Sequence, residues 1–149
     1  LSSSSAASDV YKRQNHPFVC DFRALCAQSD DISPDMLAYL KLRIICAALN
    51  EGWEPQFTED EWRYYPWFYL YTQAELDDMG DGEKQERRMI DTADYVTEYA
   101  GFGFAGSSYA PSSTAAYVGS RLCLRSSDLA VYCGKQFIKL WADFNLPRK

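Results

Sequence analysis

The longest amphipathic pattern of the chain lies between Ser33 and Gly52 and specifies one helix. Ser33 is a favourable N-cap, Pro34 suits the first helical position, and Asp35 complements the positive end of the helix dipole. Asn50-Glu51-Gly52 supplies a C-terminal stop, because glycine tolerates left-handed backbone. The pattern predicts a helix over residues 34–50, with apolar residues at helical spacing at Met36, Leu37, Leu40, Ile44, Ala47 and Ala48.

A second helical pattern lies near the end of the chain. Ser126 or Ser127 can cap it, Asp128 lies in its first turn, and Pro147 stops it. We expect one helix over about 126–144, whose broad apolar face consists of Leu129, Tyr132, Cys133, Phe137, Leu140, Trp141 and Phe144.

Two segments between these helices have the composition of strands. Residues 62–71 are rich in Trp, Tyr and Phe, and Pro66 removes one ladder donor, so this segment is predicted as an edge strand or a broken strand. The stretch AYVGSRLCLRS, residues 116–126, is predicted as a strand that alternates around Val118, Leu122 and Leu124. The order of elements predicts an α+β fold, in which a small antiparallel sheet carries the two main helices, about 34–50 and 126–144, on one face.

Acidic residues are concentrated in the middle of the chain. Fourteen of the 21 Asp and Glu residues lie between Glu51 and Glu98, against four Lys and Arg. We expect a solvated acidic insert at about 73–98, with a short helix at 73–78, a turn, and a second helix at 83–95. The net charge of −6 and the lack of a basic stripe argue against a nucleic-acid partner. No apolar run is long enough to predict a membrane span.

The five cysteines are odd in number and form no C-x-x-C pair. Cys46 and Cys133 fall on the apolar faces of the two predicted helices, which is typical of buried free thiols. This usage favours a reducing compartment over a secreted protein.

Motifs for metals and cofactors are incomplete. His16 is the one histidine of the sequence, so neither a histidine-based catalytic arrangement nor a Cys/His zinc site is expected in the main body. A calcium-loop pattern at residues 77–88 fails, because Met79 and Arg88 stand where ligands are required. The stretch GFGFAG, residues 101–106, matches G-x-G-x-x-G, but no helix opens after it, so a glycine-rich bend or loop is expected. We predict no metal and no cofactor.

Three consecutive carboxylates, Glu59, Asp60 and Glu61, precede an aromatic segment that contains Trp62, Tyr64 and Trp67. Paired carboxylates beside aromatic rings are typical of carbohydrate hydrolysis, which makes a hydrolase one alternative. An exposed acidic loop beside a sheet is the other interpretation, and we do not expect catalysis.

The first residues do not continue the pattern of the rest. Residues 4–14, SSAASDVYKRQ, resemble the in-frame translation of a transposase-type sequencing adapter; the alternative is a disordered serine-rich tail. The basic pair Lys12-Arg13 comes after the short apolar stretch, so this is not a secretory signal. We expect residues 1–14 to be a disordered artefact and residues 15–149 to be one domain whose own N-terminus is missing.

From Leu40 to Phe144 the chain resembles a family of small uncharacterised proteins from phages and prophages of gut Bacteroidetes. The resemblance rests on ALNEGWEPQFTEDEWRYYPWF, residues 48–68, and VGSRLCLRSSDLAVYCGKQFIKLWADF, residues 118–144. It implies a host-cell cytoplasmic or virion location, and it brings no activity or ligand. We therefore expect a noncatalytic interaction or structural domain.

Residues 99–120 carry no charge and are rich in Gly, Ala, Ser and Tyr. We expect a loop whose Phe102, Phe104, Tyr109 and Tyr117 contact an unknown protein or surface ligand, because rigid aromatics between small polar residues suit binding loops. Some similar sequences look like targets of diversity-generating retroelements. The loop lacks Lys, Glu, Gln, Met and Trp, which NNC codons cannot encode, so a diversified ligand-binding protein is a further alternative.

Overall fold

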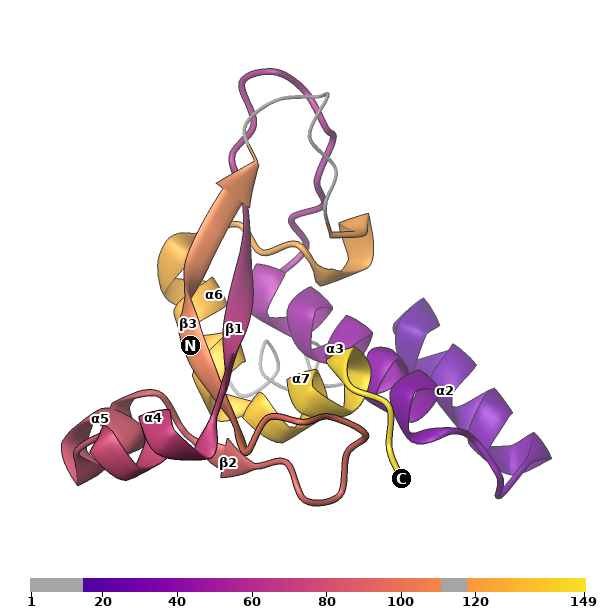
Figure 1. Ribbon diagram of the computed structural model, residues 1–149. Coiled ribbons are helices and arrows are strands. Elements are labelled where there is room, and N and C mark those ends of the chain that lie inside the picture. Colours follow the sequence, from indigo (N-terminus) through magenta and orange to yellow (C-terminus); the bar gives the residue numbers. More distant parts are fainter. Residues whose placement is uncertain (1–14, 111–117) are drawn as a thin grey trace, which may run out of the picture.

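The computed structural model describes residues 15–110 and 118–149, and it has the expected α+β architecture (Figure 1). A three-stranded antiparallel sheet has the order β1-β3-β2, with β1 at Arg63–Tyr71, β3 at Gly101–Ala110 and the short β2 at Ile90–Asp91. Helices α6 and α7 pack on one face of β1 and β3, and α3 packs on α7. The expectations for residues 1–14 lie outside the described residues.

Strand β3 is the central strand, which corrects the expectation of a loop over residues 99–120. Its residues pair with β1 from Arg63↔Ala110 to Tyr71↔Gly101, and Phe102 and Gly101 also pair with β2. Two phenylalanines at alternate positions, Phe102 and Phe104, enter the core between the sheet and the helices, and this burial fixes the segment as a strand. Glycine content alone therefore misled the sequence interpretation.

Strand β1 lies at the edge of the sheet, as Pro66 predicted. The backbone N–H and C=O of Tyr64 bond to Leu124 on the side away from β3, at 2.9 and 2.7 Å. Pro66 lies two residues further along, so its nitrogen points to the same outer side. The proline thus costs the β1–β3 ladder no hydrogen bond.

A β-bulge divides the β1–β3 pair between Trp67 and Phe68. Phe68 pairs with Phe104 and Trp67 pairs with Gly106, so Ala105 is the extra residue on β3. The bulge shifts the alternation of side chains by one position. As a result Phe104, before the bulge, and Ser107, after it, both face the helices. The hydroxyl oxygen of Ser107 lies 2.7 Å from that of Ser127 in α6.

The expected single C-terminal helix is two helices, α6 at Ser127–Gln136 and α7 at Ile138–Asn145. The break is at Phe137, whose φ of −116° and ψ of 33° leave the helical region. Ser126 caps α6 by accepting the N–H of Leu129. The change of direction lets α7 bring Trp141 against Phe68, with ring centroids 5.7 Å apart.

Helix α3 spans Pro34–Asn50, which confirms the predicted bounds. It ends where Glu51 and Gly52 take positive φ, 49° and 92°. Leu42 and Cys46 are fully buried in the core. The preceding α2, Pro17–Gln28, packs on α3 mainly through Arg43, whose guanidinium lies 4.0 Å from the Phe18 ring centroid.

Two expected elements differ in the structure. Residues 73–78 form α4 as predicted, but the predicted helix at 83–95 is α5 at Asp81–Glu86 followed by β2, because Arg88 takes a φ of 51° and Ile90 pairs with Phe102. The predicted strand within residues 116–126 is instead, from residue 118 on, a 3₁₀ turn, η1, at Ser120–Leu122, followed by the single bridge from Leu124. Both Leu122 and Leu124 are buried, as is Cys123 between them, so the alternation in the sequence reflected no exposed face.

The thiols of Cys46 and Cys133 are buried and free, as the sequence predicted. Within the described ranges no helix has the length and apolarity needed to cross a membrane.

Gly134 in α6 provides a test of how closely the helix approaches the sheet. A Cβ at this position would lie 2.6 Å from Cβ of Pro66 and 2.8 Å from a ring carbon of Phe104. Both neighbours belong to paired strands and cannot move freely. We therefore expect Gly134→Ala to lower the free energy of unfolding by about 1–3 kcal/mol in urea denaturation.

Gly82→Ala is the matched control. Its Cβ would meet nothing within 4 Å, and the residue lies inside α5. Alanine there should raise the free energy of unfolding by about 0.5 kcal/mol. If both alanines had the same small effect, the described contact of α6 with the sheet would be contradicted.

Candidate functional site

The face of the sheet that points away from α6 and α7 carries four aromatic residues of β1 at alternate positions. We call Tyr65, Trp67, Tyr69 and Tyr71 the aromatic row. The β3 residues that share this face are all small: Gly101, Gly103, Gly106 and Ser108. The row therefore has no large side chain beside it on the central strand.

Glycine on β3 is required by the contacts of the aromatic row. A Cβ at Gly106 would lie 3.2 Å from Nε1 of Trp67, and one at Gly103 would lie 3.2 Å from Cε2 of Tyr71. The rings thus lean over the central strand and occupy the space that side chains would fill. Such cross-strand covering of glycine by an aromatic ring holds the ring in one place.

Consecutive rings of the row also contact one another. Trp67 and Tyr69 meet edge to face with centroids 4.8 Å apart, and Tyr69 and Tyr71 do so at 6.2 Å. Nevertheless Trp67 is 39% exposed and Tyr69 is 48% exposed. Two large aromatic side chains therefore stand in solvent on a rigid strand.

The lower end of the row is closed by other residues. Met89 lies over the positions of Gly101 and Gly103, and Leu76 of α4 also approaches Gly101. The Tyr71 hydroxyl is buried and has no hydrogen-bond partner among the described residues. Burial raises the pKa of Tyr71, and the nearby charge of Arg87 offsets this only in part. Tyr71 is thus a half-buried support for the exposed part of the row.

A second aromatic group lies at the upper end of the strands on the opposite face. We call Trp62, Tyr64 and Tyr109 the distal cluster. The rings of Trp62 and Tyr109 have centroids 4.5 Å apart, and Tyr109 is 54% exposed. The cluster depends on the bulge, which turns Tyr109 to the same face as Tyr64.

The structure describes three of the four predicted contact residues and gives them different surroundings. Tyr109 is exposed, whereas Phe102 and Phe104 are 2% and 7% exposed and belong to the core. The expectation that these two phenylalanines contact a ligand is wrong, because the segment is a central strand and its phenylalanines pack under the sheet. Tyr117 lies outside the described residues. Trp67 and Tyr69 were missed, because only the strand register places them opposite the β3 glycines.

The carboxylates Glu59, Asp60 and Glu61 do not form a catalytic pair. Glu59 and Asp60 are exposed. Glu61 accepts the N–H groups of Gln56, at 2.7 and 3.0 Å, and of Phe57, at 3.1 Å, and it lies 3.4 Å from Arg63. Burial by itself would raise the pKa of Glu61, but these hydrogen bonds and the Arg63 charge outweigh it and lower the pKa. Glu61 is therefore a structural anchor held in its ionised form.

Arg63 is the partner that makes this anchor possible. Its side chain is buried, and the guanidinium lies 4.2 Å from the ring centroid of Phe57, a residue with a φ of 58°. The ion pair and the ring contact hold the loop before β1 against the strand. This arrangement positions Trp62 at the start of the distal cluster.

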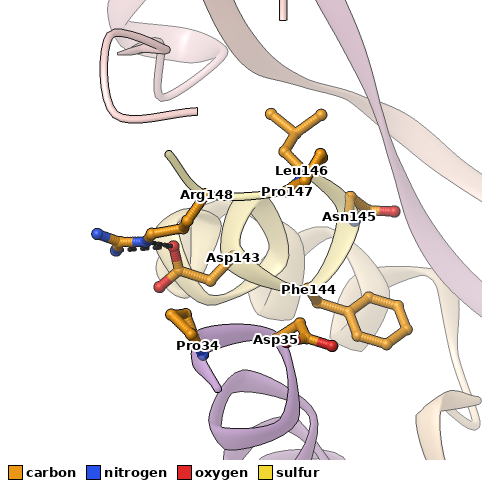
Figure 2. A pocket seen from close by; sticks show the side chains of 8 residues that line it. All are labelled: Pro34, Asp35, Asp143, Phe144, Asn145, Leu146, Pro147 and Arg148. Atoms are coloured by element: carbon orange, nitrogen blue, oxygen red, sulfur yellow. Dashed lines mark hydrogen bonds and ion pairs between the residues drawn. The ribbon is translucent and has the colours of Figure 1, made fainter. Parts of the chain in front are cut away.

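A surface pocket of about 430 Å³ lies between the start of α3 and the end of the chain (Figure 2). Figure 2 shows Arg148 and Asp143 pointing toward one another, and the distances from Nε and Nη2 to Oδ1 are 3.0 and 2.8 Å. Asp143 also accepts the hydroxyl of Tyr95 at 2.6 Å. Burial and this hydrogen bond raise the pKa of Tyr95 to about 12. Asp143 is thus committed to holding the C-terminal segment.

A second pocket of about 360 Å³ includes His16, Trp53 and Arg121 among its lining residues. His16 Nδ1 accepts the N–H of Phe18 at 3.1 Å and caps α2. This bond places the ring proton of a neutral imidazole on Nε2. No second catalytic group contacts it among the described residues, so the histidine has a capping role here.

The structure also shows where the metal and nucleotide motifs considered in the sequence lie. Within residues 15–110 and 118–149 no group of three or more His, Cys, Asp or Glu residues could hold a metal ion. The GFGFAG stretch, expected as a bend or loop, belongs to β3, and its glycines face the aromatic row instead of a phosphate.

The Glu61 anchor makes a pH-dependent prediction. The pKa of Glu61 is lowered in the folded state from an ordinary value of 4.5, so its contribution is complete above about pH 4.5 and is lost as the pH falls through the folded value. Glu61→Gln should cost about 2 kcal/mol in urea denaturation at neutral pH, because it removes the carboxylate that forms an ion pair with the buried Arg63 guanidinium. The difference from the wild type should shrink in acid.

Glu59→Gln is the matched control, because Glu59 is exposed and lies two residues before Glu61. We expect it to change the free energy of unfolding by no more than about 0.5 kcal/mol at any pH. Equal effects of the two substitutions would show that Glu61 does not anchor the loop.

Comparisons with known proteins assign no family to this chain. No protein-family model, no curated protein and no solved structure matches it significantly.

Proposed function

We propose that this chain is a noncatalytic interaction domain that binds a partner protein through the exposed part of the aromatic row. The observation that carries the proposal is the pair Trp67 and Tyr69, which are exposed yet held in place over a floor of small residues on β3. Exposed aromatic residues on a rigid element are the typical anchors of protein interfaces.

Energetics favour this surface as a contact site. A Trp or Tyr ring presents a large apolar area and loses few side-chain rotamers on binding. Trp67 and Tyr69 lose even less, because Trp67 lies against Gly106 and the Tyr69 ring contacts the rings of Trp67 and Tyr71. The partner would therefore gain the burial of two rings with little entropic cost.

The charge of the chain suggests the chemistry of the partner. The net charge is −6. The segment from Glu51 to Glu98, which contains β1 and β2, holds fourteen acidic residues and four basic ones. A partner with an apolar centre and Lys or Arg at its margin would complement this surface. Arg guanidinium groups would also stack well on the ring of Trp67.

The phage origin remains part of this proposal. The resemblance to small phage and prophage proteins supports an interaction or structural role in the host cytoplasm or in the virion. The ionised, hydrogen-bonded state of Glu61 supports a noncatalytic use of the acidic loop. If part of 99–120 is diversified, burial of Phe102 and Phe104 leaves Tyr109 as the exposed candidate among the described residues.

A random-peptide display library tests the proposal without knowledge of the natural partner. Peptides selected on the wild-type chain should bind at least tenfold more weakly to Trp67→Ser and to Tyr69→Ser, because each substitution removes a ring that the peptide would bury. Titration by isothermal calorimetry measures the affinity, and selected peptides should be enriched in Lys or Arg.

Tyr132→Ser is the matched control, since Tyr132 is equally exposed at 51% but lies on α6. It should leave peptide affinity unchanged. Selection of peptides that bind all three variants alike, or that lose affinity on Tyr132→Ser alone, would refute the aromatic row as the binding surface.

A further inference from the structure

The hydrogen-bond pattern of β1 and β3 defines which backbone groups of β3 point away from β1. In an antiparallel pair, residues directly opposite one another either both bond across the pair or both point outward. Tyr64 bonds outward to Leu124, so its partner Tyr109 must also point outward, toward the opposite edge. Ser107, opposite Pro66, lies two residues away and points the same way.

This outward edge of β3 has a partner only at its lower end. There Phe102 and Gly101 pair with β2, and the N–H of Phe104 donates to the carbonyl of Arg87 at 2.8 Å. Beyond the bulge, the N–H and C=O groups of Ser107 and Tyr109 have no backbone partner among the described residues. Figure 1 shows β2 beside the lower end of β3, whereas along its upper half the one described strand beside it is β1, on the other edge.

The two edges of the sheet differ in protection. Proteins commonly block strand edges with proline, charge or a short covering segment. The outer edge of β1 has Pro66 and the bridge to Leu124. In contrast the upper half of β3 reads AGSSYA, with no charge and no proline, so its outward edge has none of these devices.

We propose that a second copy of this chain occupies the edge, with the two β3 strands antiparallel and centred on Ser108. In this register Ser107 of each copy lies opposite Tyr109 of the other, and each such pair exchanges both of its N–H···O bonds. All the outward groups named above are then satisfied. The contact is self-complementary, as a two-fold symmetric dimer requires.

Charge favours a second copy along this seam. The chain as a whole is acidic, but the seam is the uncharged part of it, so two copies can meet there without placing carboxylates opposite one another. Tyr109 is exposed on one copy and would be covered by the other. The dimer continues the sheet across the seam and places both aromatic rows on the same face, which goes beyond the proposed binding of a partner.

Ser108 provides the decisive substitutions. It faces the open side of the sheet, and at the centre of the proposed dimer the two Ser108 side chains lie directly opposite one another in a close, non-hydrogen-bonded pair. Ser108→Lys or Ser108→Glu alone should weaken dimerisation about tenfold or more through like-charge repulsion. An equimolar mixture of the two variants should restore the dimer, because the charges are then opposite.

Sedimentation velocity on the full chain, from low to high micromolar concentration, measures the dimer. We expect a concentration-dependent dimer for the wild type and for Ser108→Thr, the uncharged control. A wild type that stays monomeric throughout would overturn the proposal. A dimer that Ser108→Lys leaves intact, or a mixture that stays monomeric, would also overturn it and place any self-association elsewhere.

Amide hydrogen exchange on the wild type tests the same edge without substitution. At low concentration the amides of Ser107 and Tyr109 should exchange fast, and at high concentration their protection should rise at least tenfold, while the amide of Ser108 stays protected by its bond to β1. Unchanged exchange at Ser107 and Tyr109 in a dimeric sample would overturn the proposed register. Because neither measurement uses a peptide or a Trp67 variant, its failure is distinct from failure of the proposed function.

Discussion

The antiparallel pairing of β1 with β3 is the contact on which the remaining structure depends. Its inner face supplies Phe68, Phe102 and Phe104. The ring of Phe68 contacts the rings of the other two and also that of Trp141 in α7. The helices in turn pack on this aromatic floor, and α6 approaches so closely that position 134 has room only for glycine. A helix that pulled away from the strands would expose most of the large apolar surface of the core.

The two faces of the same strand pair are packed in opposite ways. On the inner face, large β3 side chains fill the space under the helices. On the outer face, β3 carries only small residues, and the aromatic rings of β1 fold over them. Glycine weakens a strand through its backbone entropy, but here the covering rings of Trp67 and Tyr71 recover part of that loss. The exposed rings are therefore a product of the packing and serve as a contact surface as well.

Sequence patterns predicted the elements that local chemistry determines. Ser33, Pro34 and the glycine after Glu51 defined α3 to the residue, and Pro66 placed β1 at an edge. The patterns failed where tertiary contact decides the outcome. GFGFAG has the local character of a bend, and only the burial of its phenylalanines between the sheet and α6 makes it the central strand. The break at Phe137 and the single bridge of Leu124 likewise have no local signal. The exposed site was hidden because both faces of RYYPWFYLY are aromatic, and only the register with the β3 glycines distinguishes them.

Ala105, the extra residue of the bulge, acts as a phase shift in the chain. Below it, even-numbered residues of β3 face the helices, and above it odd-numbered ones do. Loss of one residue there would keep the sequence of the upper strand nearly intact yet exchange its two faces, so that Tyr109 would leave Trp62 and enter the side of the aromatic row. The number of residues in this short stretch therefore decides which side chains lie on each face of the sheet, whatever the identity of those side chains. Among relatives of this chain, insertions and deletions between Phe104 and Ser107 would alter recognition more than most substitutions at exposed positions.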